Sequence, residues 1–307
     1  MYGPTSVMKT TPITCADLGR SVIAVPPLCR KADWSLADEE NRKLIQHMEA
    51  GGVSTLLYGG NANLYNIALS EYPALLDFLA EAVAADTLVI PSVGPMYGNI
   101  IDQAAILKER EFPAAMILPT MFPATHAGVQ LSVRHFVERA DTRAVVYMKD
   151  PNYITPKAVK ELVDDGLVAW IKYAVVREDP LDDPILKELT ELVDPNLIVS
   201  GIGEQPAIAH LNTFGVMGFT SGCVCVQPKR SMDMLRALKA EDLETAEAIR
   251  LEFTDLEDLR NAHGPIPVLH HAVALAGIAD TGPHLPLLSS LDDSLFAPIQ
   301  AAAKALL

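Results

Sequence analysis

Residues 167–176 read Leu-Val-Ala-Trp-Ile-Lys-Tyr-Ala-Val-Val, a β-branched and aromatic run with a single charge, Lys172, in its middle. A run that is apolar on both faces is typical of a buried strand in a parallel sheet. Burial disfavours the charged form of an ammonium group and yields a neutral amine that can attack a ketone. The alternative is that Lys172 stands at the strand end and extends its ammonium into solvent. The stretch therefore predicts a parallel α/β fold and offers Lys172 as a candidate nucleophile.

Short runs of this kind alternate with amphipathic segments eight times along the chain. Strict alternation favours a closed (β/α)8 TIM barrel over an open sheet. A doubly wound sheet is the alternative, but no Gly-x-Gly-x-x-Gly follows any early strand. The predicted strands are residues 21–25, 55–58, 88–93, 114–118, 144–148, 169–174, 197–200 and 218–221. The predicted helices are residues 36–50, 70–84, 100–109, 131–139, 156–164, 184–192, 206–214 and 229–238. Ser35 is expected to cap the first helix, and proline stands at or near the first turn of four others.

The pattern changes to helices alone after about residue 240. Three helices are expected at 240–262, 267–276 and 292–306, with a Gly- and Pro-rich hinge at 263–267. The polar start of the chain is expected to be a loose extension. The predicted organisation is therefore an N-terminal extension at 1–18, a barrel at 19–238 and a C-terminal helical domain at 239–307.

The composition limits the classes of function that this protein can have. The 307 residues are 50% hydrophobic and carry a net charge of −15, which supports a large core and opposes binding to nucleic acid or an anionic membrane. The four cysteines form no Cys-x-x-Cys pair, and Cys223 and Cys225 are expected to be packed thiols in an apolar strand. No strand end offers His-x-His, so we expect neither a metal nor another cofactor. The chain shows no signal peptide and no membrane span, so we expect a soluble, cytoplasmic protein.

In barrels of this kind the active site lies at the carboxyl ends of the strands. The second predicted strand ends in Gly-Gly-Asn-Ala, and Gly60, Asn61 and Ala62 could hold a carboxylate on successive backbone N–H groups. An ordinary tight turn is the alternative. The last two strands end in Ser-Gly and Thr-Ser-Gly, which offers Gly201 and Ser221 as residues that line a ligand.

The fifth predicted strand, 144–148, adds two candidates on one face, Tyr147 and Lys149. Beside Lys172 a phenol can relay protons while an imine forms, although Tyr147 could equally be a structural tyrosine. Lys149 could bind a substrate carboxylate or rival Lys172 as the nucleophile. The simpler interpretation is a surface turn formed with Asp150.

Together these residues resemble the dihydrodipicolinate synthase/N-acetylneuraminate lyase family. The resemblance covers residues from about 19 to the C-terminus, and its motifs also include Gly-Phe-Thr-Ser-Gly at 218–222 and Gly-Pro-Ile-Pro-Val at 264–268. It implies a (β/α)8 barrel with a C-terminal helical domain, a homo-oligomer (tetramer or dimer) and class I aldolase or dehydratase chemistry on 2-oxo acids. By resemblance, Lys172 forms a Schiff base with pyruvate or a related 2-oxo acid, and Tyr147 passes protons to and from the substrate.

The sequence also departs from the family pattern. Asn61 stands where the family has a threonine whose hydroxyl belongs to the proton relay, and Met121 stands where the synthases insert a tyrosine into the neighbouring subunit's site. Asn152 replaces an arginine that holds the second substrate. These departures argue against dihydrodipicolinate synthase activity itself. A retro-aldolase, a hydratase-aldolase and a sugar-acid dehydratase stay open.

Two other classes of function remain as alternatives. A metal-dependent barrel enzyme would need histidines and carboxylates at strand ends, whereas the histidines at 47, 135, 210, 270 and 271 fall on predicted helices and His126 is expected in a solvated loop. A catalytically inactive member that binds or senses a 2-oxo acid is favoured by the altered relay.

Overall fold

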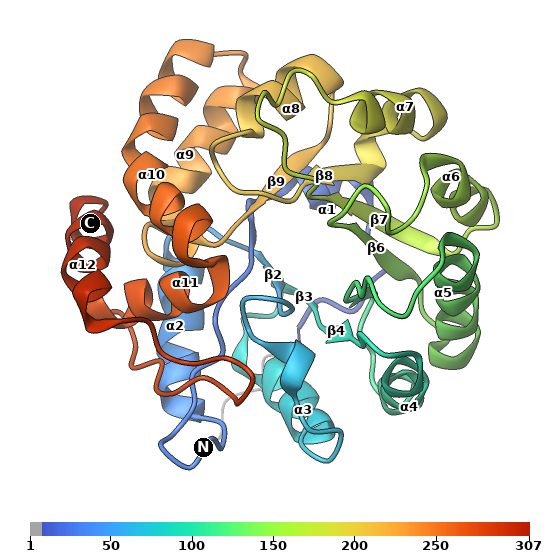
Figure 1. Cartoon of the computed structure of the whole chain (residues 1–307), viewed down its shortest axis with the longest axis horizontal. Helices are drawn as coiled ribbons and strands as arrows, with labels where there is room; N and C mark the ends of the chain where they lie inside the picture. The colour runs from blue at the N-terminus through green and yellow to red at the C-terminus, as the bar shows by residue number, and fades with distance from the viewer. Residues whose placement is uncertain (1–7) are drawn as a thin grey trace. The chain divides into compact units, whose positions relative to one another are not determined.

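The strands of the computed structural model, which describes residues 8–307, follow the order β3-β2-β1-β9-β8-β7-β6-β5-β4 (Figure 1). Pairing is parallel between β1 and β2 and from β4 to β9. This order and the strand–helix alternation confirm the predicted (β/α)8 barrel with a C-terminal helical region. The third predicted strand is two strands, because Pro91 has no N–H with which to continue the ladder. The bounds are β1 Ile23–Ala24, β2 Thr55–Leu57, β3 Leu88–Ile90, β4 Ser92–Val93, β5 Ala115–Ile117, β6 Ala144–Met148, β7 Val168–Tyr173, β8 Ile198–Ser200 and β9 Gly218–Ser221.

The helices alternate with the strands and then continue alone to the C-terminus. Their bounds are α1 Cys15–Arg20, α2 Asp38–Ala50, α3 Tyr72–Ala82, α4 Tyr97–Lys108, α5 His126–Ala140, α6 Pro156–Asp164, α7 Pro184–Leu192, α8 Ala207–Phe214, α9 Pro228–Lys239, α10 Leu243–His263, α11 Pro265–Leu275 and α12 Phe296–Ala305. Short 3-10 helices are η1 Leu64–Asn66, η2 Pro195–Leu197, η3 Cys223–Cys225 and η4 Asp293–Leu295.

Helix starts follow the local capping chemistry. Both α6 and α7 have the predicted bounds, because Thr155 and Asp183 accept hydrogen bonds from backbone N–H groups of the first turn and proline follows each cap. The prediction that Ser35 caps α2 is wrong. The helix begins after Ala37 without a side-chain cap, and the backbone N–H and hydroxyl of Ser35 both donate to Asp33 instead.

Three further expectations are corrected. Helix α5 begins at His126 rather than at residue 131, because the Thr125 side chain accepts from the backbone N–H of Gly128, so His126 is not a loop residue. Residues 15–18 are not loose but belong to α1, whose Leu18 is fully buried; residues 1–7 lie outside the described part. Cys223 and Cys225 are buried, packed thiols outside any disulfide, as expected, but they lie in η3 rather than in a strand.

Two compact units make up the chain, and the first contains residues 8–9, Ser21–Val89 and Ser221–Leu307. Within it, α10 packs against α9 and α11, and α11 packs against α12 (Figure 1). Its core includes Ile23, Leu44 and Phe253, each with no exposed surface.

The second unit contains Thr10–Arg20 and Ile90–Thr220. Helices α4 to α8 follow one another around β4 to β8, and Phe136, Trp170 and Phe219 are fully buried. The domain boundaries expected at 18/19 and 238/239 stay predictions. Within residues 8–307, no helix combines the length and apolar character needed to cross a bilayer.

Candidate active site

Strands β6 and β7 place Tyr147 beside Lys172 in the second unit. The two residues are register partners, and Lys172 Nζ lies 4.5 Å from the centroid of the Tyr147 ring. Lys172 is 5% exposed, so the ammonium does not extend into solvent. In its protonated form, a lysine over the electron-rich face of a phenol ring is attracted by that ring. The first two predicted catalytic residues are therefore brought together, and Lys172 is buried as the sequence predicts.

The strand after β7 explains why position 201 is a glycine. The backbone N–H of Gly201 donates to the carbonyl of Tyr173 at 2.6 Å, and β8 pairs Val199 with Lys172. A Cβ at Gly201 would lie 2.9 Å from Lys172 Cγ and 2.7 Å from the Cβ of Ala174. Side-chain carbons do not approach that closely, so only glycine leaves room for the lysine stem at this strand end.

The opposite face of β7 is fastened by a buried carboxylate. The Tyr173 hydroxyl donates to Asp183 at 2.6 Å, and Arg177 lies 3.2 Å from the same carboxylate. Burial and the bond to Asp183 both raise the pKa of Tyr173, so its hydroxyl stays protonated. Because neighbouring residues of a strand face opposite sides, this anchor fixes the strand end without entering the space around Lys172.

His210 makes a second bond behind the strands. Its Nδ1 lies 2.8 Å from the Ser200 hydroxyl, and its ring meets the edge of Tyr173 at 6.1 Å. Burial lowers the pKa of His210 to about 4, which keeps the ring neutral at neutral pH. Ser200 is therefore held from behind, one residue before Gly201.

Lys149 follows the end of β6 and is exposed, as in the surface-turn interpretation. Neighbouring protein atoms still desolvate its ammonium enough to lower its pKa. The Asp150 carboxylate accepts a hydrogen bond from the backbone N–H of Asn152. Nε2 of His126 lies 2.7 Å from the carbonyl of Asn152. This loop, which carries Asn152 where the family pattern has an arginine, is thus attached to the start of α5.

In the first unit, residues 60–62 form a tight turn after β2. The backbone N–H of Asn63 donates to the carbonyl of Gly60 at 2.8 Å, and Asn63 adopts a left-handed φ of 53°. Asn61 Nδ2 donates to the carbonyl of Val25 at 2.8 Å. Within residues 8–307, the backbone N–H groups of Asn61 and Ala62 donate to no protein acceptor. Two adjacent N–H groups in a turn are suited to a carboxylate.

Ser221, the last residue of β9, belongs to the same unit and contacts Val25, the residue that follows β1. Its carbonyl accepts from the backbone N–H of Val25 at 2.9 Å, and its Oγ accepts from the backbone N–H of Val224 at 3.0 Å. A Cβ at the next residue, Gly222, would lie 2.8 Å from Arg260 Nη2 and 3.1 Å from Asn61 Nδ2. Ser221 and Asn61 thus both attach to Val25.

Arg260 was not foreseen from the sequence. It comes from α10 and is 8% exposed, with Glu257 Oε1 at 3.9 Å from its Nη1. An arginine on an amphipathic helix carries no local signal that separates it from a surface residue. Its position against Gly222 is set by tertiary packing.

Comparison with known proteins identifies the family of the chain and proteins of the same fold. Residues 22–304 match the Dihydrodipicolinate synthetase family. The 4-hydroxy-tetrahydrodipicolinate synthase of Methanopyrus kandleri is 25% identical over 265 residues, which cover 85% of this chain and 76% of that protein. The crystal structure of dihydrodipicolinate synthase from Bacillus clausii superposes with a TM-score of 0.84 at 22% identity, covering 95% of this chain and 99% of that one. Ruminococcus gnavus sialic acid aldolase superposes with a TM-score of 0.80 at 15% identity, covering 94% and 97% respectively.

Proposed function

Because the chain belongs to the dihydrodipicolinate synthetase family, which supports a class I lyase in general, we propose that it forms a Schiff base between Lys172 and pyruvate or a related 2-oxo acid. The observation that carries this proposal is that the buried Lys172 Nζ lies 4.5 Å from the Tyr147 ring centroid. Burial favours the neutral amine that the reaction needs.

The proposed chemistry begins when the lone pair of Lys172 Nζ attacks the ketone carbon. A proton moves from nitrogen to the new alkoxide, with the Tyr147 hydroxyl as the relay. A second proton, taken up from solvent, then lets the carbinolamine lose water and leaves a protonated imine. The imine then accepts the electron pair of the bond that breaks at the adjacent carbon, which gives an enamine. Protonation of the enamine and hydrolysis of the imine release product and free Lys172.

The substrate carboxylate is proposed to bind at residues 60–62. The backbone N–H groups of Asn61 and Ala62 would donate to it, and Gly201, Ser221 and Lys149 are proposed as further substrate-binding residues. The turn offers donors without charge, so it suits the short carboxylate end that all 2-oxo acids share.

The departures from the family pattern favour a reaction other than that of a synthase. Asn61 has no hydroxyl, and its amide nitrogen is bonded to Val25, so the usual relay is changed. Asn152 is an uncharged residue where the synthases carry an arginine. An aldolase or a dehydratase, whose substrate has no second carboxylate to be held by that arginine, is consistent with both substitutions.

The test is to incubate the protein with pyruvate, reduce with borohydride and map the modified lysine by mass spectrometry. The reduced adduct is expected on Lys172 and should persist in Lys149→Ala but vanish in Lys172→Ala. An adduct on Lys149 in the unmodified protein would move the nucleophile to the end of β6. Circular dichroism of each variant separates loss of labelling from loss of fold.

A second candidate function is binding of a 2-oxo acid without turnover. The bond from Asn61 to Val25 favours it, because this side chain is engaged in structure rather than in proton transfer. Calorimetry with pyruvate would then show binding, and borohydride would trap nothing. This pair of results would replace the lyase proposal.

Family members are typically oligomeric, and we propose a homodimer or homotetramer here. The loop after β5 exposes 47% of Met121 and 84% of Phe122, two adjacent apolar side chains that contact with another subunit would cover. Light scattering on the purified protein should give two or four times the mass of 33.2 kDa. A mass equal to that of one chain would contradict the proposal.

A further inference from the structure

A small cavity lies in the first unit, beside the turn at 61–63. Its volume is about 10 Å³, and it is bounded by that turn, the segment 283–285, Arg30 and His270. Within residues 8–307, three nitrogens on its lining residues are buried without a hydrogen-bond partner: Arg30 Nη2, Asn63 Nδ2 and His284 Nε2. The three residues are 4%, 6% and 9% exposed, so bulk water does not satisfy them. Three unsatisfied buried polar atoms around one cavity indicate that something occupies it.

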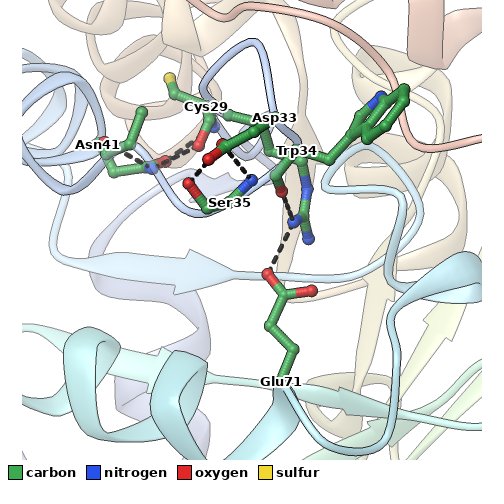
Figure 2. Close-up of polar contacts among 8 residues, drawn as sticks. Cys29, Asp33, Trp34, Ser35, Asn41 and Glu71 are labelled. Carbon is green, nitrogen blue, oxygen red and sulfur yellow. Dashed lines mark hydrogen bonds and ion pairs between the residues drawn. The ribbon is translucent and has the colours of Figure 1, made fainter.

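The arginine is held in place by its other nitrogen. Arg30 Nη1 donates to the carbonyl of Trp34 and to Oε1 of Glu71, each at 2.6 Å (Figure 2). Glu71 therefore balances the guanidinium charge, and Nη2 keeps its hydrogens for another acceptor. A negative charge in the cavity would therefore have no second positive charge to neutralise it.

The other two residues are fixed as well. Asn63 Oδ1 accepts from Asn66 Nδ2 at 2.8 Å, which leaves its Nδ2 as the group without a partner. The His284 ring contacts the His270 ring at a tilt of 39° with centroids 4.0 Å apart, and Nε2 of His270 lies 2.8 Å from the carbonyl of Gly282. Burial and the neighbouring His271 lower the pKa of His284 to about 4, so the ring is neutral at neutral pH and one of its nitrogens accepts.

We propose that the cavity binds one ordered water molecule, which accepts from Arg30 Nη2 and Asn63 Nδ2 and donates to His284 Nε2. A buried water needs roughly 10–15 Å³ and typically makes about three hydrogen bonds. The volume of about 10 Å³ is at the lower end of this range, and three nitrogens without a partner belong to residues that line the cavity. A monatomic anion would leave the site with excess negative charge, since Glu71 already neutralises Arg30.

The water would connect the turn at 61–63 to the segment 283–285. That turn carries the N–H groups of Asn61 and Ala62, so this consequence rests on the proposed function: the water positions the carboxylate-binding backbone. Asn63 is the link, because it belongs to the turn and bonds to the water. The site is a positioning site, and it takes no part in the chemistry itself.

A crystal structure that resolves solvent, with a second crystal soaked in bromide, tests the occupant directly. The expected result is a water-sized density peak within hydrogen-bond distance of all three nitrogens and no anomalous signal from bromide. An empty cavity would overturn the proposal. So would a bromide peak, which would make the site an anion site. This test does not depend on any activity.

The positioning role is tested by pyruvate binding to His284→Phe, measured by calorimetry. The variant keeps the ring and loses the acceptor, so the water should leave and pyruvate should bind about 3- to 10-fold more weakly, the effect of one hydrogen bond. The matched control is His271→Phe, because His271 belongs to the same histidine cluster but does not line the cavity. That control should bind pyruvate as the unmodified protein does.

A second variant guards against a folding defect in the first. Asn63→Gly tolerates the left-handed backbone and removes the amide donor, so it should also lose the water and weaken binding. Loss of the water with unchanged pyruvate affinity in either folded variant would refute the positioning role. If the unmodified protein neither binds pyruvate nor labels at Lys172, the proposed function fails, and the water proposal stands or falls on the density alone.

Discussion

Replacing Gly201 by alanine tests whether the space around the Lys172 stem is as tight as the distances indicate. The new Cβ would lie 2.7 Å from Ala174 Cβ, 2.9 Å from Lys172 Cγ and 2.9 Å from the carbonyl oxygen of Tyr173. Two of these three atoms belong to or lie next to the backbone and cannot rotate away. Overpacking of this kind costs about 1–3 kcal/mol. We therefore expect Gly201→Ala to lower the free energy of unfolding by that amount and to shift the lysine.

Urea unfolding measures the stability, and the rate of borohydride trapping with pyruvate measures the position of the lysine. The matched control is Gly98→Ala in α4, where a Cβ meets nothing within 4 Å and the unfolding free energy should change by no more than about 0.5 kcal/mol. If Gly201→Ala unfolds at the same urea concentration as the unmodified protein and labels Lys172 at the same rate, the steric argument is refuted.

Other expected outcomes concern the relay, the anchor and the buried histidine. Tyr147→Phe keeps the ring beside Lys172 but loses the hydroxyl, so trapping should slow by about 100-fold or more, whereas an unchanged rate would remove Tyr147 from the relay. Asp183→Ala leaves a buried hydroxyl and an arginine without their acceptor, and should cost about 3 kcal/mol in urea unfolding, while the exposed neighbour variant Asp182→Ala should stay within about 0.5 kcal/mol. The pKa of His210 is about 4 when folded and near its usual 6.5 when unfolded, so the unfolded state binds the extra proton as pH falls. Between pH 6.5 and 4 this residue should therefore remove up to about 1.4 kcal/mol of stability per pH unit, and His210→Gln should flatten that part of the profile of unfolding free energy against pH. An equally steep profile in the variant would mean that other groups titrate there.

Local patterns in the sequence were sufficient for the order of elements. All eight strand regions were expected within a few residues, and α6 and α7 have the expected bounds because proline and a capping side chain mark their first turns. Errors concentrate where the end of an element depends on a contact. Helix α5 starts early through the Thr125 cap, and α1 forms in a stretch whose polar composition suggested a loose segment.

The candidate site divides in the same way. Lys172 was recognised because one charge in an apolar run is a local signal, and Tyr147 followed from strand parity. The position of Arg260 against Gly222, and the closeness of Gly201 to Lys172 Cγ, had no such signal. Each joins residues that are far apart in the chain or whose distance depends on strand register.

The sequence by itself determined the alternation of buried strands and amphipathic helices, and with it the barrel and a buried lysine, because hydrophobic periodicity acts over a few residues. Only the tertiary structure decided that Arg30, Asn63 and His284 surround one cavity and that each keeps a nitrogen without a partner. Whether a polar group is satisfied depends on every neighbour in space, including ones more than 200 positions away in the chain. Composition and spacing along the chain do not show which residues become those neighbours.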